Sequence, residues 1–162
     1  AGQEKNAAYN LLPYKALPPA SMAQLKTYGK QGGALLLSGS YLGTDTKSEE
    51  ERLFMDEMLG VRAPGRVAND TLEGVWGMNT PIELYNLPNA THYFVQHTDV
   101  LEPTKSTAFS VFSYGKGGFS AGVANAEDMQ RSITLGFPFE CIKDETLRKY
   151  VMQGALKYLL KK

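Results

Sequence analysis

The chain has 162 residues, the length of one domain, and a chain of this length buries roughly two-thirds of its unfolded surface in a single core. Hydrophobic residues make up 43% of the sequence, a fraction that excludes a disordered chain. Seventeen basic residues balance seventeen acidic ones, which argues against general binding to nucleic acid or to an anionic membrane, because both need a net positive field.

Cysteine content and apolar runs narrow the class of protein further. Cys141 is the single cysteine, so an internal disulfide and a Cys-based metal cluster are both excluded. The longest apolar run, residues 34–37, is far shorter than the ~20 residues that span a bilayer, so no membrane span is expected. The chain begins at Ala1 rather than Met, and we expect it to be a processed form or a piece of a longer protein.

The first part of the chain predicts a lead-in, a helix and a strand. Residues 1–19 are rich in Pro, Asn and Ala and predict an irregular lead-in to a single domain over residues 20–162. A short helix is expected from about Ser21, ending before Gly32 and Gly33. The apolar run at residues 34–38, bounded by glycines, then predicts a fully buried strand.

A second helix is expected after the loop at residues 39–45. Thr46 or Ser48 is suited to cap it, and three glutamates at residues 49–51 fall in its first turn, where they complement the helix dipole. Gly60 is expected to end this helix. The order strand, Gly-rich loop, helix is typical of an α/β unit.

The middle and end of the chain predict strands and a last helix. Gly115 to Gly118 indicate a hairpin turn, and a helix is expected from an Asp144 N-cap to Leu160. The expected fold is therefore three-layer α/β, with a mixed and largely parallel sheet, flanking helices and an inserted or appended β hairpin. The expected short strands are residues 74–76, 82–84, 93–95, 109–114, 119–124 and 133–135.

The loop at residues 39–43 is the most informative local feature for function. It places backbone N–H groups at the carboxyl end of a buried strand, where ligands bind in open α/β sheets. The alternative is that the glycines only permit a tight turn. The ligand-binding candidates at this edge are Ser38, Gly39, Ser40, Tyr41, Asp45 and Glu140.

Ser40 invites a reading as a nucleophile. Its flanking glycines lie at positions −1 and +3, whereas a nucleophile elbow has them at −2 and +2. A triad needs a histidine base, which His97 could supply with Asp99 or Glu140 as the orienting carboxylate. Residues two apart on an extended segment point the same way, however, so His97 and Asp99 need not face each other. A Ser-based esterase or hydrolase is therefore the alternative prediction.

Other chemistry-bearing residues favour structural roles. His92 and His97 lie near Asp99 but lack any known metal-ligand spacing, so we expect neither a metal nor another cofactor. Cys141 is expected to be a buried structural thiol, because neither a histidine nor a helix start adjoins it. An aromatic platform for sugar rings is the alternative to core packing for four aromatic residues, Trp76, Tyr85, Tyr93 and Phe94.

Two segments together resemble one known family. Residues 28–45, YGKQGGALLLSGSYLGTD, and residues 135–142, LGFPFECI, followed by a helix ending LKYLL, resemble a domain of large exported bacterial proteins that carry the name xanthan lyase. The resemblance covers most of the chain, from about Leu17 onward. It implies a class I glutamine amidotransferase-like, flavodoxin-like fold and a periplasmic or secreted location.

The resemblance also implies a degenerate active site. Those amidotransferases use a Cys within Gly-x-Cys-x-Gly and a later His-x-Glu pair. In this chain Tyr41 stands where the Cys belongs and Pro138 where the His belongs, while Glu140 matches the Glu. Without a thiolate and its base no glutaminase reaction is expected.

The resemblance leads to a prediction of function. We expect a non-catalytic accessory domain, for binding or packing, of an exported protein that processes polysaccharide or cell-envelope material. Its expected partners are other domains of the parent protein and polysaccharide. An oligomerisation module is a further alternative. In amidotransferase-like domains one or two strand–helix units come before the strand that corresponds to residues 34–38, and residues 1–19 are too short to supply them. We therefore expect this chain alone to leave a sheet edge open, and upstream strands of the parent protein or a partner chain to cover it.

Overall fold

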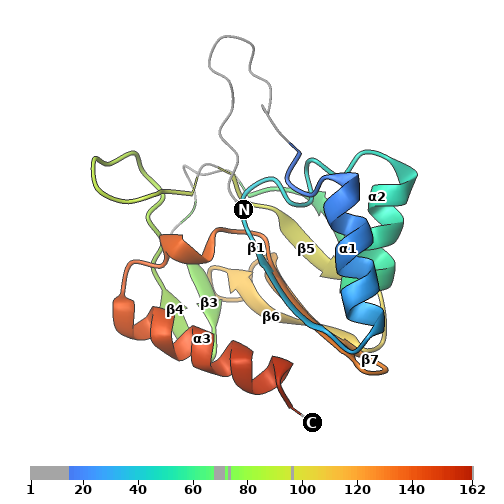
Figure 1. The fold of residues 1–162 in the computed structure, drawn as a ribbon. Coiled ribbons are helices and arrows are strands. Elements are labelled where there is room, and N and C mark those ends of the chain that lie inside the picture. The colour runs from blue at the N-terminus through green and yellow to red at the C-terminus, as the bar shows by residue number, and fades with distance from the viewer. Residues whose placement is uncertain (1–14, 68–71, 73, 96, 162) are drawn as a thin grey trace.

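The computed structural model describes residues 15–67, 72, 74–95 and 97–161, and Figure 1 shows a twisted sheet flanked by helices. The expected lead-in falls largely outside the described residues, because residues 1–14 are not among them. The six strands of the main sheet lie in the order β1-β8-β7-β6-β3-β4. Their bounds are β1 Ala34–Ser38, β3 Val75–Gly77, β4 Thr80–Ile82, β6 Ala108–Tyr114, β7 Ser120–Glu127 and β8 Gln130–Leu135.

The α/β class and the mixed sheet are confirmed, but the expectation of a largely parallel sheet is wrong. Only β1 and β8 run parallel, and the other four neighbouring pairs are antiparallel. The reason is the length of the connections: β3 to β4, β6 to β7 and β7 to β8 are joined by a few residues each. Such short turns join antiparallel strands, whereas parallel strands need a long crossover.

The hairpin predicted at the four-residue turn Gly115 to Gly118 is confirmed. Ser113 pairs with Ser120 across it, and Tyr114 N–H donates to Phe119 O at 2.8 Å. A second hairpin, between β3 and β4, was not expected. Its two turn residues, Met78 and Asn79, both have positive φ (53° and 63°), as a type I′ turn requires.

A separate two-stranded sheet pairs β2 (Val61–Gly65) with β5 (Val100–Pro103) in antiparallel fashion. Neither strand was predicted, because β2 contains Pro64 and Gly65 and the four-residue β5 ends at Pro103. Conversely, residues 93–95 form no strand; Val95 N–H instead donates to Tyr85 O at 2.6 Å.

The helices begin and end close to where the sequence places them. The first, α1, spans Pro19–Lys30, and Gly32 after it has a φ of 83°, which a glycine adopts without strain. Ser48 caps α2 (Glu49–Phe54) in a full capping box with Glu51. Asp144 caps α3 (Glu145–Leu159) by accepting a hydrogen bond from Leu147 N–H. Two shorter elements are the π-helix η1 (Met55–Leu59), which continues α2, and the 3₁₀ turn η3 (Phe139–Cys141).

Helices pack on both faces of the sheet. Side chains alternate along β1, so Leu35 joins a cluster with Met22 and Phe54, whereas Leu36 packs against the cluster that contains Val151 of α3. Figure 1 shows α1 and α2 together on one side and α3 on the other. The two clusters hold the sheet between them, and the α3-side cluster also includes Phe137, Cys141 and Ile142 from the segment that follows β8.

Strands β1 and β4 form the two edges of the main sheet. Within the described residues no strand pairs with the outer side of β1, which is the edge that the sequence predicts to be open. At the opposite edge β4 carries Pro81, whose missing N–H makes it a poor template for a further strand.

Candidate functional site

The candidate site lies where the carboxyl ends of β1 and β8 meet. Because these strands are parallel, the loop at residues 39–45 and the loop at residues 136–142 leave the same edge of the sheet. The Ser38 hydroxyl joins them: it accepts from Phe139 N–H at 2.6 Å and donates to Phe137 O at 3.2 Å. Ser38 therefore holds the two loops together.

Tyr41 adopts a conformation that is unusual for a bulky residue. Its φ is +65°, in the left-handed region, and its side chain is only 4% exposed. Backbone strain of this kind marks the sharp strand-to-helix turn on which nucleophiles of α/β enzymes sit. Here the position holds a tyrosine whose ring stacks on His97, with centroids 4.2 Å apart and planes 16° apart.

The charges around the Tyr41 hydroxyl do not activate it. Burial raises the pKa of Tyr41, the negative charge of Asp99 raises it further, and the nearby Arg66 only opposes these effects. A raised pKa keeps the phenol protonated at neutral pH. Tyr41 therefore supplies packing at the elbow rather than a nucleophile.

Asp99 is the centre of the polar contacts at the site. It is fully buried, and its carboxylate accepts three hydrogen bonds: from Gly43 N–H at 3.1 Å, from Thr44 N–H at 2.9 Å and from the Thr44 hydroxyl at 2.7 Å. These backbone N–H groups are the donors that a loop of this kind offers to a ligand anion. Within the protein, the Asp99 carboxylate already occupies them.

His97 completes this network in a way that fixes its proton. Its Nε2 lies 2.7 Å from Thr44 Oγ1 and 3.5 Å from Asp99 Oδ1. The Thr44 hydroxyl has one proton, which it donates to Asp99, so it accepts from His97 and places the imidazole proton on Nε2. The two side chains point the same way, as expected for residues two apart, and both meet Thr44.

Ser40 lies in the same loop but takes no part in the network. Its side chain is fully buried, and its hydroxyl has no hydrogen-bond partner within the described part of the chain. The contacts of His97 go to Thr44, Asp99 and Tyr41 instead. The hydrogen bond that would activate Ser40 as a nucleophile is therefore not formed.

The second loop brings no base to the site. Pro138 is buried, and Glu140 is exposed in the 3₁₀ turn η3. Cys141 next to it is fully buried, and burial, with a smaller contribution from the Glu140 charge, raises the pKa of its thiol to about 12. Cys141 is thus a thiol at neutral pH, in line with a structural role.

Asp45, another ligand-binding candidate, forms hydrogen bonds with Lys15 and Ala16, the first two residues of the described chain. Its carboxylate accepts from Ala16 N–H at 2.9 Å, and the Lys15 ammonium donates to its backbone oxygen at 3.0 Å. The same ammonium contacts the Glu51 carboxylate at 2.7 Å. The residues before α1 are thus fastened to the loop by charge.

The remaining predicted positions lie apart from this network. His92 is exposed, stacks on Tyr85 and contacts the hydroxyl of Thr91. Over the described residues, no three His, Cys, Asp or Glu side chains gather closely enough to hold a metal ion. In the same part of the chain, every helix is too short or too polar to cross a membrane.

Two residues of the site escaped the sequence prediction. Thr44 joins His97 to Asp99, and the buried Tyr114 hydroxyl lies 2.9 Å from both the Asp99 and the Gly136 backbone oxygens. Thr44 adjoins the predicted loop, so its position was a usable signal. Tyr114 looks like an ordinary strand residue, and only the tertiary pairing brings it to the site.

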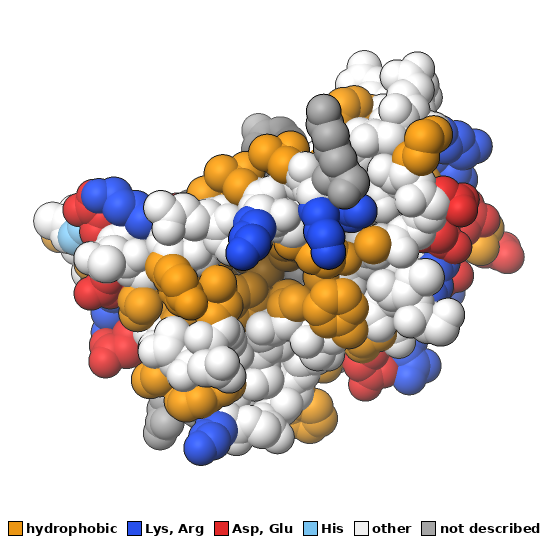
Figure 2. Space-filling model, turned by 90° about the horizontal axis from the view of Figure 1, so that it is seen from below, with side chains coloured by type: hydrophobic (Ala, Val, Ile, Leu, Met, Phe, Trp, Pro, Cys, Tyr) orange, Lys and Arg blue, Asp and Glu red, His pale blue; other side chains and the backbone are white. Residues whose placement is uncertain are grey.

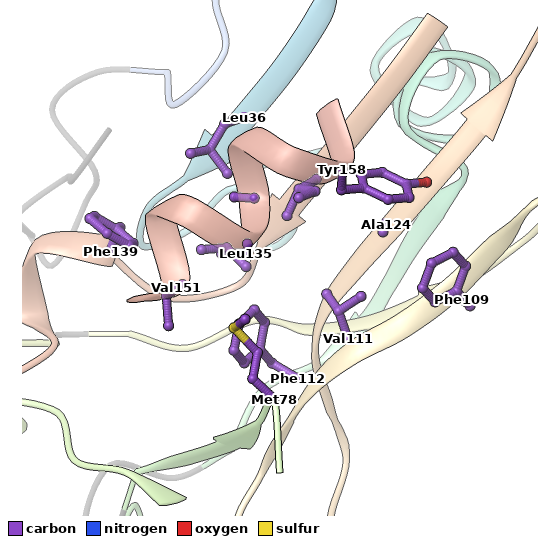
Figure 3. Close-up of a pocket in the computed structure, with 13 residues that line it drawn as sticks. Leu36, Met78, Phe109, Val111, Phe112, Ala124, Leu135, Phe139, Val151 and Tyr158 are labelled. Carbon is purple, nitrogen blue, oxygen red and sulfur yellow. The ribbon is translucent and has the colours of Figure 1, made fainter. Parts of the chain in front are cut away.

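Apart from the polar site around Asp99, the protein has an apolar groove. It lies between α3 and the sheet, and Figure 2 shows apolar side chains gathered around a hollow on that face. In Figure 3, Val151 and Tyr158 of α3 face Val111 and Phe112 of β6, with Met78 beside them. The groove holds about 580 Å³ of free space, part of it open to solvent. Its lining contains no carboxylate, imidazole or amine, so it can seat an apolar group but offers no acid–base chemistry.

Filling part of this groove is expected to stabilise the protein. Gly154 lies inside α3, where glycine costs about 0.5–1 kcal/mol relative to alanine. A Cβ at this position would meet the Met78 side chain, its methyl at 2.5 Å and its sulfur at 3.4 Å, and this flexible end can turn into the adjoining groove. Gly154→Ala should therefore raise the free energy of unfolding by about 0.5 kcal/mol, measured by urea denaturation. A loss of stability would mean that Met78 is fixed in place.

Comparisons with known proteins place the fold. No protein-family profile and no curated protein matches the sequence. Among solved structures, the GH42 β-galactosidase Gan42B from G. stearothermophilus is similar over 87% of this chain, with a TM-score of 0.57 and 14% identity. A β-galactosidase from Rahnella sp. R3 is similar over 88% (TM-score 0.56, 14% identity), and the exo-β-1,4-mannosidase Op5Man5 from Opitutaceae bacterium strain TAV5 over 89% (TM-score 0.52, 13% identity).

These likenesses concern the fold. The chain spans only 20% to 23% of the length of the three glycosidases. At such low identity, the similarity shows that the α/β arrangement of this chain also occurs within larger proteins, and it transfers no activity.

Proposed function

We propose that this chain is a non-catalytic accessory domain, for binding or packing, of an exported protein that processes polysaccharide or cell-envelope material. The observation that carries the proposal is the Asp99 carboxylate, which fills the anion-binding donors of Gly43 and Thr44. The loop that would hold a reacting group is thereby used to stabilise the fold. A flavodoxin-like, class I amidotransferase-like ancestry forms part of the same proposal.

The catalytic positions implied by the resemblance support it. Tyr41 fills the elbow with a stacked, protonated phenol, and Pro138 has no proton to transfer. Neither side chain can form the covalent thioester on which glutamine hydrolysis depends. The names of the similar structures, two β-galactosidases and a mannosidase, direct the proposal toward proteins that act on carbohydrate.

The Ser-based hydrolase is the function to be tested against it. We expect Ser40→Ala to hydrolyse p-nitrophenyl acetate at the same low rate as the wild type, because the Ser40 hydroxyl has no histidine partner. Its stability should be unchanged or raised by up to about 1 kcal/mol, since an unpaired buried hydroxyl is removed. Hydrolysis by the wild type that disappears in Ser40→Ala, in a variant that is still folded, would overturn the accessory-domain proposal.

A further inference from the structure

The only tryptophan of the chain, Trp76, is not one of the residues that make up the candidate site around Asp99. Trp76 is the middle residue of β3, and its cross-strand neighbours are Pro81 on β4 and Ser113 on β6. Val75 beside it is buried in the α3-side cluster. Because successive side chains of a strand point to opposite faces, Trp76 faces away from that cluster. It is only partly buried there.

A cation is held over the Trp76 ring by the β6–β7 hairpin. The Lys116 ammonium lies 5.2 Å from the ring centroid. The hairpin turn is fastened to the start of β3, because Gly115 N–H donates to Gly74 O at 3.2 Å. Lys116 is exposed, and no carboxylate among the described residues forms an ion pair with it. A positive charge therefore stands at the aromatic ring.

Two adjoining hollows extend from this ring along the edge strand β4. The first holds about 540 Å³ of free space and is lined by Trp76, Lys116 and Glu83, among others. The second holds about 730 Å³ and is lined by Lys143 and the start of α3. Pro81 and Glu83 line both hollows, so the two lie next to each other, and we call the pair the β4 trough. The Lys143 ammonium contacts the Glu83 carboxylate at 3.2 Å.

The chemistry of the β4 trough matches that of a sugar chain. A pyranose ring presents a face of C–H groups, which packs on a flat aromatic ring, and a rim of hydroxyls that both donate and accept hydrogen bonds. Trp76 supplies the flat ring. Glu83 accepts hydrogen bonds, and Lys116 and Lys143 donate them. A nucleic acid fits less well, because the chain has no net positive charge to attract a chain of phosphates.

We propose that the β4 trough binds an oligosaccharide, with one sugar ring stacked on Trp76 and an acidic substituent paired with Lys116. The assignment rests on the proposed accessory function and deepens it, because it names the ligand class and the surface. The Lys116 ammonium over the Trp76 ring is the reason for an acidic sugar. Binding to acidic chains should accordingly weaken as salt is added, whereas stacking alone would be insensitive to salt.

The single tryptophan makes the test specific. Wild-type protein is titrated with oligogalacturonate, xanthan fragments and cellohexaose, and Trp76 fluorescence is followed alongside calorimetry. We expect a saturable change in emission, and stronger binding of the two acidic ligands than of cellohexaose. Trp76→Ala should lose at least tenfold in affinity by calorimetry, and Trp76→Phe should recover part of it. Lys116→Gln should lose severalfold for the acidic ligands only.

A variant at a different exposed aromatic residue provides the matched control. Tyr28→Ala removes another half-exposed aromatic ring, on α1, and should bind like the wild type. If the wild type binds a saccharide but the Trp76 and Lys116 variants bind it equally well, the trough is the wrong surface while the accessory function stands. If the wild type binds none of the three, the carbohydrate part of the proposed function fails as well. Should Trp76→Ala unfold, Trp76→Phe and Lys116→Gln decide, since each removes fewer atoms from the surface than Trp76→Ala.

Discussion

Replacing Asp99 with asparagine is expected to destabilise the protein by about 2–4 kcal/mol. The carboxylate is fully buried and accepts from the backbone of Gly43 and Thr44 and from the Thr44 hydroxyl. Asparagine has nearly the same shape but only one accepting oxygen, so its amide group must face a donor at one of the two oxygen positions. The loss of charge-assisted hydrogen bonds adds to the cost of a buried donor left unpaired.

Urea denaturation followed by circular dichroism measures this loss as a lower midpoint at an unchanged slope. Glu50→Gln is the matched control, because it makes the same chemical change at an exposed position of α2. The control should change the free energy of unfolding by no more than about 0.5 kcal/mol. A loss of that small size in Asp99→Asn would contradict a structural role for the carboxylate and return Asp99 to the list of candidate catalytic residues.

Elements with strong local signals could be predicted from the sequence. The apolar run between glycines predicted β1, a cap at Thr46 or Ser48 predicted the start of α2, and the Asp144 cap predicted the start of α3. The turn at Gly115 gave the β6–β7 hairpin. Each of these signals lies within a few residues of the element that it specifies, so no knowledge of distant contacts was needed.

Elements that depend on distant pairing could not be predicted. Strands β2 and β5 are about forty residues apart, as the Arg62–Glu102 ion pair across them illustrates, and each contains proline. The β3–β4 turn uses Met78 and Asn79 with positive φ, although Met is a poor residue for that conformation. Sheet direction was misjudged because the strand–loop–helix pattern after β1 suggested repeated parallel crossovers, whereas short hairpins follow.

The candidate site shows the same division. The loop at residues 39–45 could be singled out from its glycines, and His97 and Asp99 from their types. Their grouping around Thr44 could not, because the contacts join residues 53 and 55 positions apart. The sequence also could not show that the loop donors meet a carboxylate of the same protein, the contact on which the proposed structural role of this loop rests.

Acid is expected to weaken the protein through Glu51, which ties the residues before α1 to α2. The pKa of Glu51 is lowered from 4.5 to about 2, first because Lys15 donates a hydrogen bond to it and also because Ser48 and Lys47 backbone N–H groups do. Burial opposes this shift. A folded-state pKa below the unfolded value stabilises the protein above about pH 4.5, and this stabilisation is lost as the pH falls toward 2.

The size of the effect follows from about 1.4 kcal/mol per pKa unit, reduced because the Lys15 side chain is 41% exposed and solvent screens its charge. Glu51→Gln should therefore cost about 1–3 kcal/mol at pH 7, and the difference from the wild type should shrink steadily in unfolding experiments between pH 4.5 and 2. Glu49→Gln, at an exposed position of the same helical turn, serves as the control and should cost only a few tenths of a kcal/mol. If the Glu51→Gln deficit were the same at pH 7 and pH 2.5, its cause would be lost packing rather than lost charge, and the ion pair with Lys15 would contribute nothing to folding.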